Sequence, residues 1–363
     1  MVSAMSAGWA SEQRANASSV LAGLVDLSPA NFAMVMATGI VSLAAHQHGL
    51  DRVAFALFWL AGIAWAVLWC MNTLRMLVFP RRFYGDMVDH MSGPGYFTSV
   101  AATAVLGAQF VILAHRPWLG GVLLALAYVL WLVLTYTVFA AMIVKDVKPT
   151  LDKGISGAWL LAVVATQSLA VLGALLATQT PPPWRLMLNF FALAMWLWGG
   201  MQYIWMVSLI FYRDTFFHFA PVDLTPPHWI SMGAMAISTL VGALLIDNAA
   251  NAPMLKVLTP FLMGFMVFYW ATGTWWVPMM IVLDVWSYVY KRFPFHYDPL
   301  DWGAVFPLGM YAVCTYDMAR VLALDFLWPL PVAFLVLALL AWVAAFAGLL
   351  RRIVQWLRAA RAR

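Results

Sequence analysis

Long apolar runs, interrupted by short clusters of proline, glycine and charged residues, follow one another along this chain. Each run holds 20 residues or more, and about 20 apolar residues are what an α-helix needs to cross a bilayer. The ten runs occupy residues 29–48, 53–78, 95–114, 118–143, 156–177, 185–211, 227–246, 257–287, 299–323 and 327–350. No connection is long enough for a soluble domain. The sequence therefore predicts an all-α integral membrane protein in which residues 29–350 form one domain of ten transmembrane helices.

The composition excludes several other classes of protein. Of the 363 residues, 64% are hydrophobic and 10% are charged, whereas an ordinary soluble domain is about 45–50% apolar and about 25% charged. A water-soluble enzyme of this size would lack the charge to cover its surface, and a disordered or fibrous chain would not be so apolar. A transmembrane β-barrel is excluded because its strands are alternating segments of about ten residues.

The basic residues predict the orientation of the chain. Of the 20 lysines and arginines, 15 fall in segments on the same side as the N-terminus and 5 on the opposite side. The positive-inside rule then puts both termini in the cytoplasm. We expect the chain to cross the inner (plasma) membrane of a bacterium several times. Residues 1–28 lack the basic start and apolar core of a signal peptide, so they are expected to be a cytoplasmic segment before an uncleaved first span. Residues 351–363 are expected to be a basic cytoplasmic tail that contacts anionic lipid rather than nucleic acid.

Two kinds of span alternate along the chain. The odd spans are rich in glycine, alanine, serine and threonine, whereas the even spans carry most of the tryptophans. Small residues let helices approach closely inside a membrane bundle, so we expect an inner layer of odd helices and an outer layer of even ones. Any tight ten-helix bundle would also use small residues somewhere, but the strict alternation favours two layers.

A weak internal repeat supports the two layers. Each odd span opens with an aromatic residue shortly after a proline or glycine: Phe32, Phe97, Trp159, Trp229 and Trp302. Their spacings of 65, 62, 70 and 73 residues fit one helical hairpin with its loop. Five such hairpins of the same topology predict five inner helices around a central path.

Residues at equal offsets from the five aromatics are predicted to line that path. The residues four positions after each aromatic residue are Met36, Ala101, Val163, Gly233 and Phe306. The residues one helical turn after these are Gly39, Ala104, Thr166, Ala236 and Gly309. Phe306 is the single large aromatic among these side chains, so it is the candidate plug of a narrow conduit. The alternative is that Phe306 is simply one of 23 phenylalanines and packs a core.

The distribution of charge favours a path for anions. A proton pump would need acidic or histidine relays in mid-span and a cation channel would need acidic rings. The odd spans offer neither, and Asp317 and Arg320, near the outer end of the ninth span, are expected to pair with each other or to bind substrate. Basic residues in the cytoplasmic loops are expected to attract anions to the inner mouth: Arg81, Arg82, Lys145, Lys148 and Lys153.

An enzyme is a weaker interpretation. The seven histidines all lie at span ends or in loops, and the sequence has no HExxH motif, Cys/His cluster or paired carboxylates. Cys70 and Cys314, the two cysteines, both fall in apolar runs and do not suggest a disulfide framework. We therefore expect no catalytic residue, no cofactor and no bound metal.

Several motifs together resemble the tellurite-resistance/dicarboxylate transporter family. Residues 28–42, SPANFAMVMATGIVS, resemble its first-helix motif, although Ala37 stands where the family usually has glycine. Residues 302–309, WGAVFPLG, resemble its ninth-helix motif, and residues 93–97 and 153–159 are similar to bacterial members. The resemblance extends from the first span to the ninth.

The resemblance implies a fold and a function. The family includes bacterial tellurite-resistance proteins, the yeast malic acid transporter, fungal sulfite efflux pumps and the plant guard-cell slow-type anion channel. It implies five hairpins with pseudo-five-fold symmetry, a pore lined by the odd-numbered helices, a homotrimer, and a phenylalanine gate that falls on Phe306 through its Phe-Pro context. The function expected is passage of small anions, most simply efflux. The alternative is proton-coupled transport of a C4-dicarboxylate such as malate, or of sulfite.

Overall fold

The computed structural model describes residues 23–294 and 298–361, and within them it is helical, with no β-strand. Ten helices have 15 residues or more. The odd members are α3 (Ala33–Gln47), α6 (Phe97–Ile112), α9 (Leu161–Gln179), α11 (Ile230–Asn248) and α13 (Trp302–Leu322). The even members are α4 (Asp51–Val78), α7 (Pro117–Val144), α10 (Trp184–Phe216), α12 (Pro253–Asp284) and α14 (Pro329–Arg361).

Nine of these helices, among the described residues, are long and apolar enough to cross a membrane. The helix outside that set is α13, which carries Asp317 and Arg320. The ten predicted helical segments are therefore present, while the tenth membrane crossing stays a prediction.

The two ends of the chain differ in how far the structure tests them. Residues 1–22 and 362–363 lie outside the described part, and with them most of the segment 1–28. Leu24 and Val25 are buried against Phe79, after the end of α4. Residues 351–361 continue α14, so the predicted basic segment begins as an extension of the last long helix. That the membrane span ends at residue 350 and that this segment is a cytoplasmic tail stay predictions. Arginine, leucine and alanine there are good helix formers, and no proline or glycine stops the helix.

Burial separates the long helices into two layers, as the alternation predicted. In the spans that contain α3, α6, α9 and α11, 83%, 89%, 94% and 83% of the apolar window is buried. The corresponding shares for α4, α7, α10, α12 and α14 are 28%, 39%, 44%, 22% and 17%. Most of α13 is buried as well. The odd helices therefore form the inner layer and the even helices the outer one.

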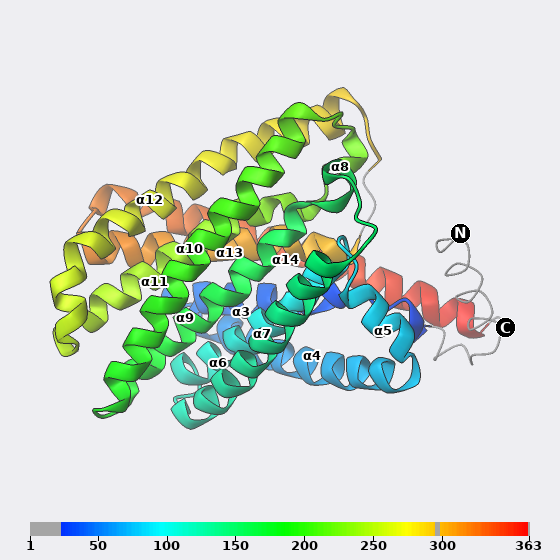
Figure 1. The fold of residues 1–363 in the computed structure, drawn as a ribbon. Coiled ribbons are helices and arrows are strands. Elements are labelled where there is room, and N and C mark those ends of the chain that lie inside the picture. The colour runs from blue at the N-terminus through cyan, green and yellow to red at the C-terminus, as the bar shows by residue number, and fades with distance from the viewer. Residues whose placement is uncertain (1–22, 295–297, 362–363) are drawn as a thin grey trace.

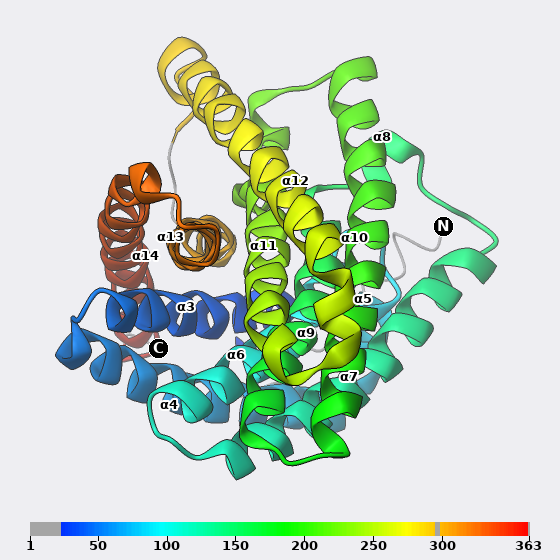
Figure 2. The same ribbon diagram turned by 90° about the vertical axis from the view of Figure 1, so that its left-hand side faces the viewer.

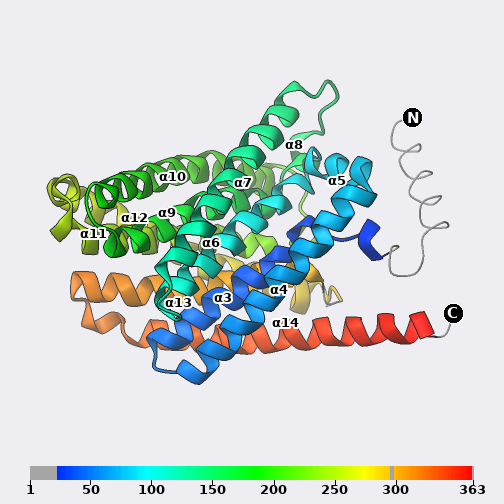
Figure 3. The same ribbon diagram turned by 90° about the horizontal axis from the view of Figure 1, so that it is seen from below.

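The five inner helices close into a ring. Contacts join α3 to α6, α6 to α9, α9 to α11, α11 to α13 and α13 back to α3. Each inner helix also packs against the outer helix that follows it in the chain, so the fold is a cycle of five hairpins, with the pseudo-five-fold arrangement that was predicted. Figures 1 and 3 show this bundle from the side and from below.

A 3₁₀ turn precedes each inner helix. These turns are η1 (Pro29–Phe32), η2 (Gly93–Tyr96), η3 (Gly157–Leu160), η5 (Pro226–Trp229) and η8 (Pro299–Asp301). They too form a closed ring, because each contacts the next and η8 contacts η1. All five begin with proline or glycine, which explains the repeated pattern of the sequence. This end of the bundle is called the linker end. The linkers with α5 (Pro80–Met87) and α8 (Leu151–Gly154) lie there, on the right of Figure 1, and the short hairpin turns lie at the opposite, turn end.

Five tryptophans of the outer layer tie the two layers together. Each lies on the outer helix of one hairpin and donates its indole N–H to the inner helix of the next hairpin. The pairs are Trp65 with Thr103 (3.0 Å), Trp131 with Thr166 (2.8 Å), Trp196 with the carbonyl of Ser238 (2.7 Å), Trp270 with Thr315 (3.0 Å) and Trp342 with Thr38 (2.9 Å). The outer-layer tryptophans are therefore not all directed at lipid, and these five fix the position of the inner ring.

Candidate functional site

The tryptophan bonds show which face of each inner helix points outward. Successive residues of an α-helix are about 100° apart. Met36 and Ala101 each precede the tryptophan-bonded threonine of their helix by two residues, so they lie on the opposite face, toward the ring axis. Phe306 precedes Thr315 by nine residues, about two and a half turns, and also faces away from the outer layer. All three side chains are buried.

Two of the predicted lining residues face the outer layer instead. The hydroxyl of Thr166 accepts the indole N–H of Trp131 and donates to the amide oxygen of Gln202 on α10 at 2.8 Å. Val163 lies three residues earlier, about 60° away on the helix surface, and shares that outward face. The residue on the axial face is Val164, which is also buried. The register of this repeat is therefore shifted by one residue: the tryptophan-bonded Thr166 lies seven residues after Trp159, whereas Thr38 and Thr103 lie six residues after Phe32 and Phe97.

The predicted glycines lie where inner helices approach each other. A Cβ at Gly39 would come within 2.6 Å of Val105 on α6, and one at Gly233 within 2.8 Å of Pro307 on α13. One at Gly309 would lie 3.0 Å from Ile40 on α3. Ala104 and Ala236 are also buried in the inner layer. These small residues therefore close the ring by allowing its helices to touch.

Phe306 lies at a break in the hydrogen bonding of α13. Pro307 follows it inside the helix and has no N–H to donate. The ring of Pro307 rests on Gly233, so the backbone around Phe306 lies directly against α11. The fully buried phenyl ring is thus attached to a segment whose backbone is less constrained than a regular helix.

Gln109 is a polar residue of the inner layer that our sequence analysis missed. Its side chain is fully buried on α6, and among the described residues neither amide atom has a hydrogen-bond partner. The amide oxygen lies 3.1 Å from where a Cβ of Gly39 would be, so the amide faces α3. An unpartnered buried amide costs free energy and calls for an explanation.

A charged cluster ties three inner helices at the turn end. Arg320 donates to Asp317 at 3.1 Å, which confirms the predicted pair. Arg320 also donates to Asp247 on α11 at 3.2 Å, and Gln47 on α3 donates to Asp317 at 2.9 Å. The sequence could not reveal the last two partners because they come from other hairpins.

The predicted basic residues are all exposed at the linker end. Arg81 and Arg82 lie on α5, Lys145 and Lys148 follow α7, and Lys153 lies on α8. Burial lowers the pKa of His90, and the nearby charges of Lys145 and Lys148 lower it further. The carbonyl of His90 accepts the indole N–H of Trp159 at 3.0 Å. The two lysines therefore lie close to the start of α9.

Two buried arginines fasten outer helices to the linkers at this end, and neither was recognised as such from the sequence. Near the end of α4, Arg75 pairs with Asp86 and donates to Tyr96 of η2 at 3.4 Å. Near the end of α10, Arg213 contacts Asp214 at 3.2 Å and Asp223 at 3.1 Å.

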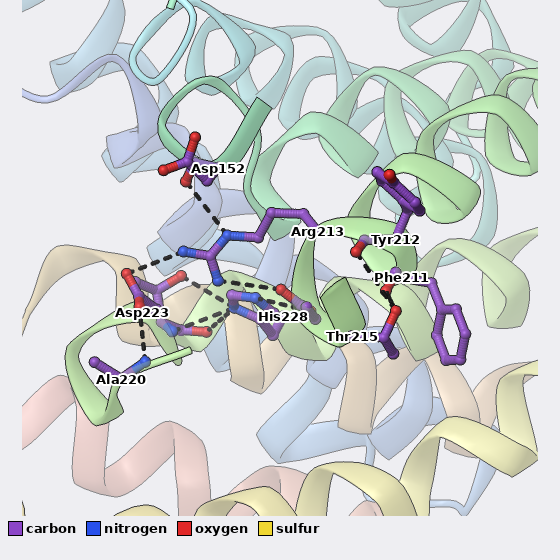
Figure 4. Close-up of polar contacts among 10 residues, drawn as sticks. Asp152, Phe211, Tyr212, Arg213, Thr215, Ala220, Asp223 and His228 are labelled. Atoms are coloured by element: carbon purple, nitrogen blue, oxygen red, sulfur yellow. Dashed lines mark hydrogen bonds and ion pairs between the residues drawn. The ribbon is translucent and has the colours of Figure 1, made fainter. Parts of the chain in front are cut away.

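Figure 4 shows that Arg213 joins three stretches of chain. Its Nε donates to the carbonyl of Asp152 on α8 at 3.3 Å. Phe219 lies under the guanidinium group, whose central carbon is 5.2 Å from the centroid of the ring. His228 of η5 lies 3.7 Å from Asp214. Both arginine clusters have a signal in the sequence that could have revealed them. In each, a single arginine near the end of an apolar run is followed by aspartates in the next loop.

Comparison with known proteins agrees with this architecture. A family model described as voltage-dependent anion channel matches residues 26–350. The chain belongs to the voltage-dependent anion channel family. The match confirms the resemblance to the tellurite-resistance/dicarboxylate transporters, and with the long apolar helices it identifies a multi-pass membrane protein of a channel and transporter family.

Individual relatives carry little functional information. An uncharacterized membrane protein of Mycobacterium tuberculosis is 40% identical over 116 residues, which is 32% of this chain and 58% of the relative. The chain thus spans just over half the length of that mycobacterial protein. Two uncharacterized transporters of Methanocaldococcus jannaschii are 24% and 22% identical, each over 81% of this chain and over 84% and 85% of their own length.

Proposed function

We propose that this voltage-dependent anion channel family member lets small anions pass along the axis of the inner-helix ring and that Phe306 closes the path. The observation that carries the proposal is the closed ring of α3, α6, α9, α11 and α13, with Phe306 fully buried on the axial face of α13. Met36, Ala101 and Val164 occupy the axial faces of their helices and are proposed as lining residues.

The positive charge at the linker end of the bundle supports anions as the substrate. All five inner helices begin at the linker end, where their N-termini carry partial positive charge. The exposed basic residues of α5, α8 and the linkers lie at the same end. We infer that this end faces the cytoplasm of a bacterium, that both termini lie there, and that anions are concentrated there before efflux.

The test is anion flux through proteoliposomes. Phe306→Ala should raise the flux of chloride or nitrate about tenfold or more, because it removes the only aromatic side chain proposed to fill the path. Phe58→Ala is the matched control: Phe58 is equally buried but lies on α4 against Phe110. Unchanged flux through a folded Phe306→Ala variant, or equal increases in both variants, would refute the gate.

The second candidate is proton-coupled transport of a dicarboxylate or of sulfite. Among the described residues, the acidic side chains of the inner helices are Asp247 and Asp317, which pair with Arg320 at the turn end. This arrangement favours passive passage, since a proton relay would need titratable groups further along the path. Malate or sulfite uptake that requires a pH gradient would establish the coupled mechanism and exclude the channel.

We further infer a homotrimer in the plasma membrane, without cofactor or enzymatic activity, as the family resemblance implies. Mass measurement of the protein in detergent tests the assembly directly. A monomer that conducts anions would show that the path lies within one chain, as five inner helices in a single ring require.

A further inference from the structure

One of the five hairpin junctions is built differently from the other four. Elsewhere the outer helix of one hairpin packs closely on the inner helix of the next: α4 on α6, α7 on α9, α10 on α11 and α14 on α3. Within the described residues, α12 and α13 lack this close backbone packing and are bridged by side chains instead. Trp270 donates to Thr315 at 3.0 Å, and the hydroxyls of Thr274 and Tyr311 are 2.7 Å apart. Figures 1 and 2 show the later end of α12 well apart from α13.

A crevice of about 940 Å³ lies between the end of α12 and the helices α13 and α14. The α12–α13 crevice has small apolar residues on two of its walls. Ala304 and Val305 of α13 form one wall, and Ala345 and Gly348 of α14 form part of another. The crevice lies beside long, lipid-exposed helices, so an acyl chain of the bilayer has direct access to its apolar walls.

Charged groups of both signs lie at the linker end of the crevice. Arg351 and Arg352 on α14 are exposed there, and neither has an ion-pair partner among the described residues. Two carboxylates also line the crevice: Asp284 accepts the indole N–H of Trp229 at 3.1 Å, and Asp301 accepts the N–H of Asp298 at 3.0 Å. Each carboxylate retains oxygen lone pairs for another donor.

We propose that the α12–α13 crevice binds one phospholipid whose headgroup carries both a phosphate and a primary amine, as in phosphatidylethanolamine. The phosphate lies on Arg351 and Arg352, because arginine matches phosphate oxygens with paired N–H groups. The ammonium group lies on Asp284 and Asp301, and an acyl chain follows the apolar walls of α13 and α14. Basic pockets between transmembrane helices are known to bind lipid headgroups, and the pair of carboxylates selects the amine.

The bound lipid would act on the proposed gate. Val305 lines the crevice and directly precedes Phe306, so a lipid against this wall restricts movement of the segment that carries the phenyl ring. This step rests on the proposed function, whereas lipid binding itself does not. We expect anion flux to depend on phosphatidylethanolamine and Phe306→Ala to be insensitive to it.

Lipid binding is tested by native mass spectrometry of the full chain in detergent, titrated with phosphatidylethanolamine or phosphatidylglycerol. The wild type should retain one phosphatidylethanolamine per chain. The double variant Arg351→Gln, Arg352→Gln and the filling variant Ala345→Trp should each weaken binding about tenfold or more. Arg358→Gln, further along α14, and Val343→Trp, on the exposed side of that helix, are the matched controls and should bind like the wild type.

Three results would overturn the proposal. Equal retention of phosphatidylglycerol would exclude recognition of the amine. Undiminished binding by the double arginine variant would place the lipid elsewhere. Loss of oligomers, rather than of lipid, in Ala345→Trp would show that the crevice is a contact between chains. If binding behaves as expected but flux is indifferent to lipid, the binding site stands and the coupling to the gate fails. If no variant conducts anions, the proposed function fails without affecting the lipid site.

Discussion

Trp131 on α7 donates its indole N–H to the hydroxyl of Thr166 on α9 at 2.8 Å, and this bond crosses from the outer layer of one hairpin to the inner layer of the next. The same relationship recurs at all five junctions of the ring. In a membrane, packing and hydrogen bonds must hold helices together, because the lipid is as apolar as the helix surface. The five tryptophans are therefore polar contacts that hold the inner ring in place against the outer layer.

Removing the acceptor should destabilise the bundle. Thr166→Val leaves the buried N–H of Trp131 and the hydrogen-bonding capacity of Gln202 unused, which should cost about 1–3 kcal/mol and lower the melting temperature in detergent. Thr135→Val is the matched control, because the buried hydroxyl of Thr135 has no partner among the described residues. Equal effects of the two substitutions would contradict the role of the bond.

Much of the fold was predictable because it follows from periodic features of the sequence. Runs of apolar residues located the ten helices, and the alternation of small residues with tryptophan predicted the two layers. The repeated proline or glycine before each odd span marked the five 3₁₀ turns. Contacts between residues close in the sequence were predictable as well, such as the ion pair of Asp317 and Arg320, which are three residues apart on one helix.

The candidate site was less predictable because it depends on the rotation of each helix. An error of one residue rotates a side chain by about 100°, which is why Val163 and Thr166 were assigned to the axis although they face the outer layer. The contacts of Arg213 with the carbonyl of Asp152 and of Gln47 with Asp317 join residues far apart in the chain, and a single sequence contains no signal for such contacts.

Close approach of α3 and α6 depends on the absence of a side chain at Gly39. A methyl group there would lie 2.6 Å from Val105, so Gly39→Ala should force the helices apart at a cost of about 1–3 kcal/mol. Gly264 on α12 has no neighbouring atom within 4 Å of an added Cβ. Gly264→Ala should therefore leave stability unchanged or raise it by about 0.5–1 kcal/mol. A thermal-shift measurement in which both variants change in the same direction would refute the close contact.

The ion pairs of Arg213 should contribute more to the stability of the fold than those of the exposed arginines at the linker end. Arg213→Gln leaves Asp214 and Asp223 without their buried cation, and breaking such a cluster typically costs about 3–5 kcal/mol. Arg82→Gln removes only a partly exposed pair with Asp86 at 3.6 Å and should cost less than about 1 kcal/mol. Limited proteolysis of the linker between α7 and α9 gives an independent measurement, since Arg213 holds the carbonyl of Asp152 there. An unchanged cleavage rate in Arg213→Gln would show that Arg213 does not hold the linker in place.

Gln109 allows stability and transport to be separated in one substitution. Its amide is fully buried without a partner among the described residues, so replacement by methionine, which has a similar shape, should raise the free energy of unfolding by about 1–3 kcal/mol. An amide that costs stability persists when it serves function, and its N–H₂ group can donate to an anion that passes along α6. We therefore expect Gln109→Met to melt at a higher temperature but to carry less chloride and nitrate in proteoliposomes. A variant that is less stable than the wild type would show that the amide has a partner, and a more stable variant with unchanged flux and selectivity would remove Gln109 from the proposed path.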